Sequence, residues 1–504
     1  MVDVVVAGGG PVGMFLATEL RLAGVEVVVL ERSVDPNPHS RAFRLQPRTL
    51  DVLDSRGLLD RFRADHLDWP SAHFAGLRPL LDLGRTGGEH PHSLLIPQAH
   101  TERILEERAA ALGADIRRGH ELVGLRQDDA AATARVRLVG GEHAGGEYEI
   151  SARYLVGCDG GRSAVRRLAE IGFPGTGGRV SALLGDVTLD DPDKLPSGIP
   201  GTLRTPAGLL MAVALEPGIT RVLTTEFGRD LPDPETPMTL DELRDSVRRV
   251  TGEDVTMREP RWLSRFGDAT CLADHYRDHR VLLAGDAAHV HFPIGAQGLN
   301  LGLQDAVNLG WKLAGEVRGW APRTLLDSYD RERRPVARAV LRETRAQLAL
   351  MNPDESINPL RELFGELLAL DEVNAYLAAL VSGVDVRYVF EDAEDGSLAG
   401  GYAPACAIMS AAGATRPAEL LRTGRGVALL PEDSADLAEL RAGWGDRVDM
   451  VGATVKGREG AAALLLRPDG YVAWSAASGL ADDAVDGLRR SLTTWFGEPS
   501  EGPR

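Results

Sequence analysis

A glycine-rich segment near the start of this 504-residue chain, Gly8-Gly9-Gly10-Pro11-Val12-Gly13, restricts the fold more than any other feature. It follows the apolar run Val4–Ala7, and apolar residues at helical spacing follow it from Met14 to Leu20. The glycines therefore lie where a strand turns into a helix. This order predicts the first unit of a Rossmann-type α/β fold.

Each glycine in this turn suits a bound pyrophosphate. Gly8 permits a tight turn, Gly10 lets the backbone approach the phosphates, and Gly13 lets helix and strand pack closely, while the helix N-terminus supplies amide donors. A second apolar run, Glu26–Leu30, leads to Glu31, where an acid for the ribose hydroxyls is expected. Glycine-rich turns alone need bind nothing, but strand, helix and acid together predict a nucleotide site.

Two later strands also end in acids. One apolar run ends in Asp159, ahead of a helix that begins near Ser163, and an Asp-Gly turn is its simplest explanation. Another ends in Asp286, and a helix is expected from Leu299 to Leu313 after a proline-containing turn. Such carboxylates can accept hydrogen bonds from ribose or ribitol hydroxyls, and a helix N-terminus near Gly298 suits an electron-rich ring edge.

These motifs, with Ser40-Arg41 and the stretch from Gly285 to Asn300, give the chain a resemblance to a known family. It resembles the class A flavoprotein monooxygenases typified by para-hydroxybenzoate hydroxylase, and among them the bacterial aromatic polyketide hydroxylases. The likeness covers nearly the whole chain, since residues 113–120 and 467–471 also match that subgroup. It implies an α/β fold with a Rossmann-type FAD-binding domain, an antiparallel-sheet substrate domain and a C-terminal thioredoxin-like domain.

The resemblance implies where FAD would lie. Glu31 would bind the adenosine ribose, and Arg32 would lie beside the adenine. Arg41 would lie along the pyrophosphate or the flavin edge, and Gln98 would lie near the ribitol. Asp159 belongs to a motif that would contact both FAD and the nicotinamide donor.

At the flavin end, Asp286 would bind the ribitol. Pro293 and the amides around Gly298, Leu299 and Asn300 would meet the isoalloxazine ring. The chain departs from the subgroup at Ala296, where those hydroxylases often have glycine, and the extra methyl group would narrow the space for flavin or substrate.

The cofactor residues expected from the glycine turn are Gly8, Gly10, Pro11, Val12 and Gly13.

The activity that the resemblance implies is hydroxylation of a bulky, phenolic polyketide. NADPH or NADH would reduce FAD, O2 would form a hydroperoxide at flavin C4a, and its distal oxygen would pass to an electron-rich aromatic carbon. The chain shows no second Rossmann fingerprint for the nicotinamide nucleotide, which this class binds transiently. No nucleophile triad is evident, because Ser163 is better explained as a helix N-cap, so the cofactor must supply the chemistry.

Three domains are expected. The FAD-binding domain with its helical extension is discontinuous, over residues 1–175 and 266–390. Residues 176–265 alternate turn clusters with apolar runs, which predicts the antiparallel substrate-binding sheet. Residues 391–504 form the thioredoxin-like domain, with a hairpin signal and a last helix reaching Phe496. Because this domain lacks a CxxC motif, we expect a structural or interface role.

Composition excludes several classes. The formal net charge of -18 disfavours nucleic acid and anionic membranes as partners. No apolar run approaches the length of a membrane helix, and the N-terminal apolar stretch is interpreted as a core strand. Three widely spaced cysteines suggest neither disulfides nor a metal site, so a cytoplasmic location is expected. A homo-oligomer is compatible with these features.

Four residues are candidates for a catalytic role. His289 and His291 flank the loop before Pro293, where a base could deprotonate a phenol, although loop histidines more often bind backbone. His73 and Arg221 could reach a pocket from sheet strands, although packing or surface roles are commoner. The charged stretch 329–335 is interpreted as a solvated, salt-bridged start of a helix.

Other reactions remain open. With the same cofactor, the chain could insert oxygen into a cyclic ketone by Baeyer–Villiger chemistry or inactivate an aromatic antibiotic. A flavin reductase or dehydrogenase that never uses O2 is a different class. A flavoprotein with a binding or assembly role is a third alternative, suggested only by the C-terminal domain.

Overall fold

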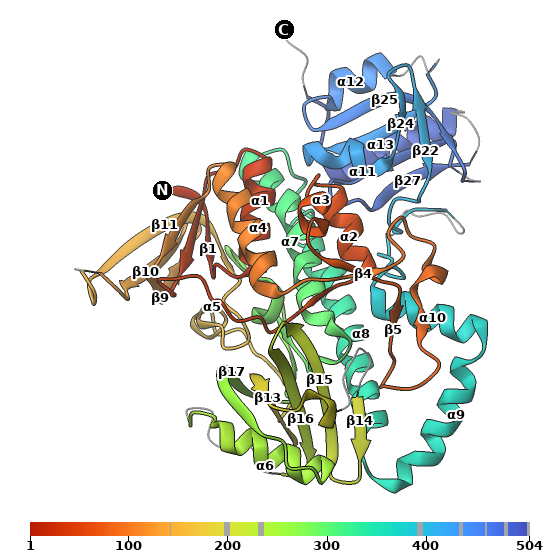
Figure 1. Cartoon of the computed structure of the whole chain (residues 1–504). Helices are drawn as coiled ribbons and strands as arrows, with labels where there is room; N and C mark the ends of the chain where they lie inside the picture. Colours follow the sequence, from red (N-terminus) through yellow and green to blue (C-terminus); the bar gives the residue numbers. More distant parts are fainter. Residues whose placement is uncertain are drawn as a thin grey trace.

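The computed structural model describes residues 1–141, 143–195, 202–229, 236–390, 397–432, 437–458, 461–477 and 482–500. Figure 1 shows three regions, each built on its own sheet. The N-terminal region lies between an antiparallel sheet at the lower end of the view and the C-terminal region at the upper end. The mixed α/β architecture expected from the sequence is confirmed.

An eight-stranded sheet forms the first region, with the main order β19-β20-β11-β1-β2-β8 and with β9 and β10 extending from β11. Neighbouring strands from β20 to β8 are parallel. Parallel strands covered on both faces consist of apolar runs, and Val4–Val6 are fully buried. The strands are β1 (Val2–Ala7), β2 (Val27–Glu31), β8 (Asp115–Arg118), β9 (His120–Gln127), β10 (Ala132–Leu138), β11 (Glu147–Gly157), β19 (Arg277–Asp278) and β20 (Val281–Leu283).

Helices cover this sheet, and α7 is the longest of them. It spans Gln297–Arg318, so it begins two residues before the predicted helix and ends five residues after it, where Gly319 adopts a left-handed conformation. Pro11 occupies the first turn of α1, where its missing N–H costs nothing. The other helices of this region are α1 (Pro11–Leu22), α2 (Pro47–Asp54), α3 (Leu59–Arg63), α4 (Gln98–Ala111) and α5 (Ala164–Leu168).

The second region is a five-stranded antiparallel sheet of order β14-β15-β16-β13-β17, as predicted from the alternating apolar runs. Helix α6 packs on one face, and its apolar residues share a core cluster with the sheet. The elements are β13 (Val180–Leu189), β14 (Thr202–Thr205), β15 (Gly208–Glu216), β16 (Ile219–Phe227), α6 (Leu240–Thr251) and β17 (Met257–Gly267).

Three helices and three small sheets connect these regions. The helices are α8 (Ser328–Met351), α9 (Asn358–Leu368) and α10 (Asp371–Ser382). The small sheets pair β3 (Arg44–Leu45), β7 (Ser93–Leu95) and β4 (Leu67–Trp69); β5 (Ser71–Ala72) and β6 (Leu81–Asp82); and β12 (Gly175–Thr176), β18 (Thr270–Leu272) and β21 (His289–Val290). None of the helices in the described ranges combines the length and apolar character needed to cross a bilayer.

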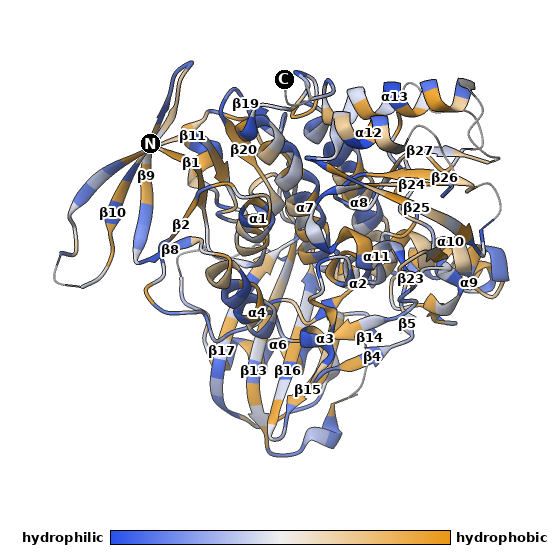
Figure 2. Cartoon of the chain, turned by 90° about the horizontal axis from the view of Figure 1, so that it is seen from above, coloured by the Kyte–Doolittle hydropathy of each residue, from blue (hydrophilic) through white to orange (hydrophobic). Residues whose placement is uncertain are grey.

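The C-terminal region contains a six-stranded mixed sheet of order β23-β22-β25-β24-β26-β27, whose central strands are strongly apolar (Figure 2). The predicted hairpin is confirmed, because β26 and β27 pair antiparallel. The last helix ends at Phe496, as expected. The elements are β22 (Ala407–Ser410), β23 (Gly413–Thr415), α11 (Pro417–Leu420), β24 (Gly426–Leu430), α12 (Leu437–Trp444), β25 (Val448–Lys456), β26 (Ala463–Leu466), β27 (Val472–Ala476) and α13 (Asp482–Phe496).

A buried charged cluster joins the C-terminal region to the first. Arg467, in the turn between β26 and β27, donates to both carboxylate oxygens of Glu332 on α8 (2.8 and 2.7 Å). Lys312 on α7 donates to the same carboxylate (2.8 Å). Residues 329–335 do begin a helix with salt bridges, as predicted, but the expected solvation of the whole stretch is wrong, because Tyr329 and Arg333 are fully buried. The partners of this stretch come from segments distant in sequence, so local charge alternation could not reveal them.

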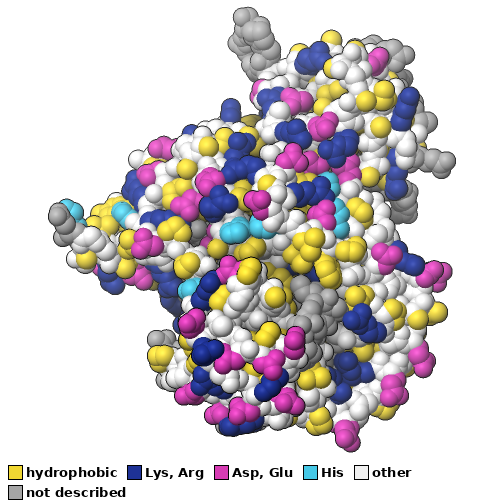
Figure 3. Space-filling view, viewed as in Figure 1, with side chains coloured by type: hydrophobic (Ala, Val, Ile, Leu, Met, Phe, Trp, Pro, Cys, Tyr) yellow, Lys and Arg dark blue, Asp and Glu magenta, His cyan; other side chains and the backbone are white. Residues whose placement is uncertain are grey.

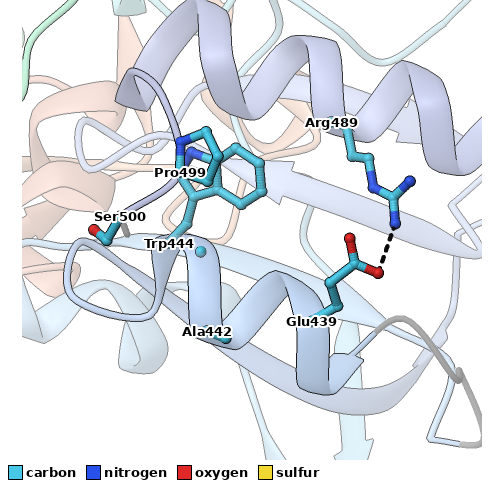
Figure 4. Close-up of a pocket in the computed structure, with 7 residues that line it drawn as sticks. Glu439, Ala442, Trp444, Arg489, Pro499 and Ser500 are labelled. Carbon is cyan, nitrogen blue, oxygen red and sulfur yellow. Dashed lines mark ion pairs between the residues drawn. The ribbon is translucent and has the colours of Figure 1, made fainter. Parts of the chain in front are cut away.

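The surface mixes basic and acidic side chains over the face shown in Figure 3. A shallow pocket between α12 and α13 is lined by Trp444 and Pro499 and bordered by the ion pair of Arg489 and Glu439 (3.1 Å; Figure 4). It lies in the C-terminal region, far along the chain from the glycine-rich turn.

Candidate active site

The sequence motifs meet at one edge of the eight-stranded sheet. Ala7 pairs with both Leu30 and Gly157 in the parallel ladder, and Gly157 pairs with Leu283. The carboxyl ends of four strands therefore lie along one edge, where ligands bind in open α/β sheets. The motif residues at or just beyond these ends are Gly8, Glu31, Asp159 and Asp286.

The glycine turn is tightly packed at Gly8 and Gly13 and open at Gly10. A Cβ on Gly8 would lie 2.4 Å from the carbonyl oxygen of Cys158, and one on Gly13 would lie 2.0 Å from the carbonyl oxygen of Gly8. At Gly10, in contrast, no heavy atom of the described residues, apart from Gly10 and its chain neighbours, lies within 4 Å of the position that a Cβ would occupy. The open side is the one expected to face a ligand.

Glu31 is held by the glycine turn itself. Its Oε2 accepts a hydrogen bond from the Gly9 amide (2.7 Å), and its Oε1 accepts one from the Ser33 amide (2.8 Å). A carboxylate has about four acceptor sites, so two remain for ribose hydroxyls. Arg32, the next residue, is exposed.

The two motifs, 276 residues apart in sequence, touch each other through Val12. A Cβ on Gly285 would lie 3.0 Å from Val12 Cγ2, and one on Gly302 would lie 2.6 Å from the same atom. Glycine at both positions lets α1, α7 and the strand end of β20 approach closely. The structure thus brings the N-terminal turn and the Asp286 segment into one site.

The start of α7 is shaped by an unusual backbone. Ala296 adopts the left-handed conformation (φ 54°, ψ 39°), which L-residues with a Cβ adopt at a cost. Asn300 stabilises this start: its Nδ2 donates to the Ala296 carbonyl (2.7 Å), and its Oδ1 accepts from the Gln46 amide (2.7 Å). Leu299 is half-buried beside it, and Pro293 is exposed in the preceding loop.

Asp286 and His291 lie close to this helix start. The Asp286 carboxylate is exposed, and a Cβ on Gly298 would lie 4.0 Å from its Oδ1 and 3.4 Å from His291 Nε2. His291 Nδ1 donates to the Phe292 carbonyl (2.8 Å), while its Nε2 is buried without a partner in the described part of the chain. Burial lowers the pKa of His291, which keeps the imidazole neutral.

His289 has a different environment. It is fully buried, and its Nε2 shares a hydrogen bond with Asp305 Oδ2 (2.7 Å). Asp305 also accepts from the Gly285 amide (3.1 Å) and from Arg333 Nε (2.8 Å). Burial alone would raise the pKa of Asp305, but the charge of Arg333 and the contact with His289 hold it below its usual value. Asp305 thus fixes the turn that carries Asp286, and His289 contributes to this support.

The Arg41 loop is held from two sides. Gln98 lies at the start of α4. Its side-chain Oε1 accepts a hydrogen bond from the backbone amide of Ala42 (3.1 Å), and its backbone amide donates to the carbonyl of Ala42 (2.9 Å). Arg221 on β16 forms a buried bidentate pair with Asp186 (2.8 Å to each oxygen) and donates to the Arg41 carbonyl (3.3 Å). Both residues position the loop, and Arg41 itself projects an exposed side chain.

Asp159 and His73 both bind backbone groups. Asp159 Oδ2 accepts from the Ala164 and Val165 amides at the start of α5 (2.6 and 3.1 Å), and Ser163 caps the same helix, as predicted. Asp159 Oδ1 is buried without a partner in the described ranges. His73 Nδ1 accepts from the Gly76 amide (3.4 Å), and burial lowers the pKa of His73 to about 4.

The residues at this edge fit FAD. Backbone amides at the start of α1 lie beside the open side of Gly10, which suits a pyrophosphate. Carboxylates at the strand ends suit ribose and ribitol hydroxyls, and Asp159 Oδ1 has spare acceptor capacity. The start of a 22-residue helix follows Asp286 and suits the electron-rich edge of a flavin.

Comparison with known proteins decides the family. Residues 1–344 match the model for an FAD binding domain, and residues 396–499 match that for the C-terminal part of aromatic-ring hydroxylases. The chain belongs to the FAD-dependent aromatic-ring hydroxylases. The resemblance to class A flavoprotein monooxygenases is thereby confirmed, and membership assigns the chain as an FAD-dependent aromatic monooxygenase that uses O2.

Three full-length similarities illustrate the family. The solved structure of the OxyS anhydrotetracycline hydroxylase from Streptomyces rimosus is 43% identical, with a TM-score of 0.91 over 99% of this chain and 100% of that one. A rifampicin monooxygenase from Streptomyces venezuelae is 44% identical over 100% of both chains. A dialkyldecalin synthase from Streptomyces rugosporus is 40% identical over 98% of both chains.

Several residues that shape the site escaped sequence reasoning. Asp305 and Arg333 are ordinary helical charges in the sequence, and only the packing of α7 against α8 makes them a buried pair. Gln297 and Gln347 are likewise unremarkable in sequence, but both are buried near the start of α7. The predicted helix from Leu299 contained the polar residues Asn300 and Gln304, but Gln297 lay outside it.

Proposed function

We propose that this monooxygenase uses NADPH or NADH to hydroxylate a bulky aromatic polyketide beside the loop from Pro293 to Gly298. The main support is the full-length similarity to an anhydrotetracycline hydroxylase, together with an apolar cluster that includes Phe292 of the same loop. Bound FAD would take electrons from the nicotinamide donor and activate O2 for transfer to the substrate ring.

The apolar cluster supports a large aromatic substrate. It joins Phe292 of the flavin-side loop to Phe74, to Leu209 of the antiparallel sheet and to Met351 at the end of α8. Phe266 and Phe292 lie 5.7 Å apart between ring centroids, a distance typical of aromatic packing. A fused polycyclic ligand that contacts such side chains would bury apolar area on several sides at once.

The cofactor residues divide by task in this proposal. The Gly8–Gly13 turn and Glu31 would hold the pyrophosphate and the adenosine ribose. Asp286 would bind the ribitol, and the first amides of α7 would stabilise negative charge at the pyrimidine edge of the flavin. Asp159 Oδ1 and Arg41 would lie on the flavin side, where the nicotinamide donor must also approach.

His291 is the residue we propose to accept the phenol proton. Its Nε2 is unpartnered in the described structure and lies near Gly298, and its neutral imidazole can act as a base. His289 is less suited, because Asp305 occupies its Nε2.

A reducing cytoplasm suits the three free cysteines and supplies the nicotinamide donor.

Turnover in air tests this proposal. Purified holoenzyme is supplied with NADPH or NADH and with anhydrotetracycline, rifampicin and other polycyclic phenols, while donor oxidation, peroxide and product mass are followed. We expect at least one compound to accelerate donor oxidation, with little peroxide and a product heavier by one oxygen. Bound FAD with no oxygen gained by any compound would instead favour a reductase or a binding role.

A further inference from the structure

We infer that the side-chain amides of Gln297 and Gln347 form a two-donor clamp for one ring-carbonyl or enolate oxygen of the substrate. The inference rests on the proposed function and adds to it the chemical group that the substrate must present. It starts from two buried amide nitrogens, Gln297 Nε2 and Gln347 Nε2, that have no hydrogen-bond partner within the described ranges.

Both glutamines are buried: Gln347 is 0% exposed and Gln297 is 5% exposed. A buried donor without a partner is destabilising, so two in one place need an explanation. The orientation of Gln347 is fixed, because its Oε1 accepts a hydrogen bond from the Ala75 amide (3.2 Å). Its Nε2 must therefore point away from Ala75.

The two donors converge on one point. A Cβ built on Gly295 would lie 3.3 Å from Gln297 Nε2 and 3.7 Å from Gln347 Nε2. Gln297 reaches this point from the first residue of α7, and Gln347 reaches it from the last turns of α8. Two helices thus place amide nitrogens beside the same point.

The nearby backbone acceptors are already used. The Gly295 carbonyl accepts from Gln46 Nε2 (2.8 Å), and the Ala296 carbonyl accepts from Asn300 Nδ2 (2.7 Å). Rotating Gln347 toward those carbonyls would break the hydrogen bond that its Oε1 accepts from the Ala75 amide. An acceptor brought by a ligand satisfies both amides without this loss.

The surroundings define the acceptor. Phe292 and Ile294, which precede Gly295 in the same loop, belong to the apolar cluster described above, so we expect a largely apolar ligand. The donors are uncharged, and they lie at the positive end of the α7 dipole, which favours an oxygen with partial or full negative charge. A keto or enolate oxygen on a fused ring system meets both requirements.

Gly295 keeps a side chain away from the two amides. Its φ of +72° disfavours any residue with a Cβ, and a Cβ there would lie only 3.3 Å from Gln297 Nε2. The same position lies between Pro293 and Gly298, in the loop expected to face the flavin. An oxygen held here would fix the substrate rings against that loop.

A pair of ligands that differ only in the acceptor tests the clamp. Kd values are measured by flavin absorbance titration of the holoenzyme with 1,8-dihydroxyanthraquinone, which has ring carbonyls, and with 1,8-dihydroxyanthracene, which has none. Wild-type protein should bind the quinone roughly tenfold more tightly or better. Gln297→Met and Gln347→Met should each reduce this preference to about twofold or less.

Controls separate the clamp from a structural role. Gln304→Met, on the same helix, should keep the full preference. Gln347→Glu retains the oxygen that accepts from Ala75, so at mildly alkaline pH it should fold and still lose the preference. A merely structural role would weaken both ligands equally and leave their ratio unchanged.

Every other result counts against the clamp. An unchanged ratio in the methionine variants, or no binding of the quinone by wild-type protein, would overturn it. Loss of FAD or a shift in flavin potential with the ratio intact would show that the amides serve the flavin carbonyls instead. Turnover of anhydrotetracycline or rifampicin is measured in parallel, so that failure of the clamp is distinguished from failure of the proposed hydroxylation.

Discussion

The two ends of the cofactor site are built differently. At the adenosine end, the glycine turn and Glu31 satisfy one another through short backbone contacts before any ligand is considered. At the flavin end, Asp286 is exposed, and His291 and Gln297 carry buried polar atoms without partners in the described chain. The glycine turn and Glu31 form a rigid backbone cradle at the first end. The second end consists of side chains available to ligands.

This difference indicates which end of the site determines the affinity for FAD and which end takes part in the reaction. Substitutions in the cradle should act through the fold or through the overall affinity for FAD. Substitutions at the flavin end should leave the fold intact and change what is bound or how a proton moves.

The largest effect is expected for Gly13→Ala. The new Cβ would lie 2.0 Å from the Gly8 carbonyl oxygen, so the turn must shift. We expect the free energy of unfolding of the apoprotein to fall by about 3 kcal/mol. Thermal or urea unfolding measures it, with Gly10→Ala as the matched control because its Cβ meets no atom. Equal stability of the two variants would contradict the tight turn.

Gly10→Val should spare the fold and remove the cofactor. The protein leaves space at this position, but a branched side chain would occupy the approach to the pyrophosphate. We expect the Kd for FAD to rise about 100-fold, or about 2.7 kcal/mol. Fluorescence titration of the apoprotein with FAD checks this, and normal flavin content would place the pyrophosphate elsewhere.

Asp286→Ala should weaken FAD binding at the other end. Removing a carboxylate that binds ribitol costs about 1.5–3 kcal/mol, so the Kd should rise about 10- to 100-fold while unfolding is unchanged. Asp286→Asn keeps one acceptor oxygen and should lose less. If alanine and asparagine variants bind FAD as the wild type does, Asp286 is not a cofactor ligand.

His291 should set the acidic limit of turnover. Burial lowers its pKa from the usual value of about 6.5, so the neutral base persists below that pH and is lost only as pH falls through the lowered pKa. His291→Asn should reduce kcat about 10- to 100-fold and abolish this limb of the kcat/KM profile. An identical acidic limb in the variant would exclude His291 as the base.

The smallest effect is expected for Ala296→Gly. Glycine relieves the left-handed backbone at this position and should stabilise the protein by about 1 kcal/mol. Ala288→Gly, in the preceding turn at negative φ (-98°), is the control and should not stabilise. The two shifts in Tm are compared directly. A Tm gain at Ala288 but not at Ala296 would contradict the proposed strain.

The cradle was predictable because its signals are local. The strand, the glycines, the helix and Glu31 lie within 30 residues, and their spacing reflects backbone geometry that one segment determines. The same holds for the Ser163 cap and for the hairpin between β26 and β27. The strand-end pattern also located Asp286 and a helix from Leu299, and the family resemblance then implied their roles at the flavin.

The buried charged residues that support the site were not predictable, because their partners lie far away in the sequence. The buried charges Asp305, Glu332 and Arg467 come from two helices and the C-terminal turn, and each looks like a surface residue in its own segment. The role of Arg221 as a brace for the Arg41 loop also needed the antiparallel sheet in place. Ion pairs between segments that are distant in sequence produce no recognisable pattern in a single sequence.

The most direct test of the central claim is turnover under 18O2. Holoenzyme with NADPH and anhydrotetracycline, or the best compound from the panel, is incubated under labelled oxygen, and the product is analysed by mass spectrometry. We predict one 18O atom in the product ring and no product without O2. An unlabelled product, or one formed equally well without O2, would contradict assignment of this chain as an aromatic hydroxylase.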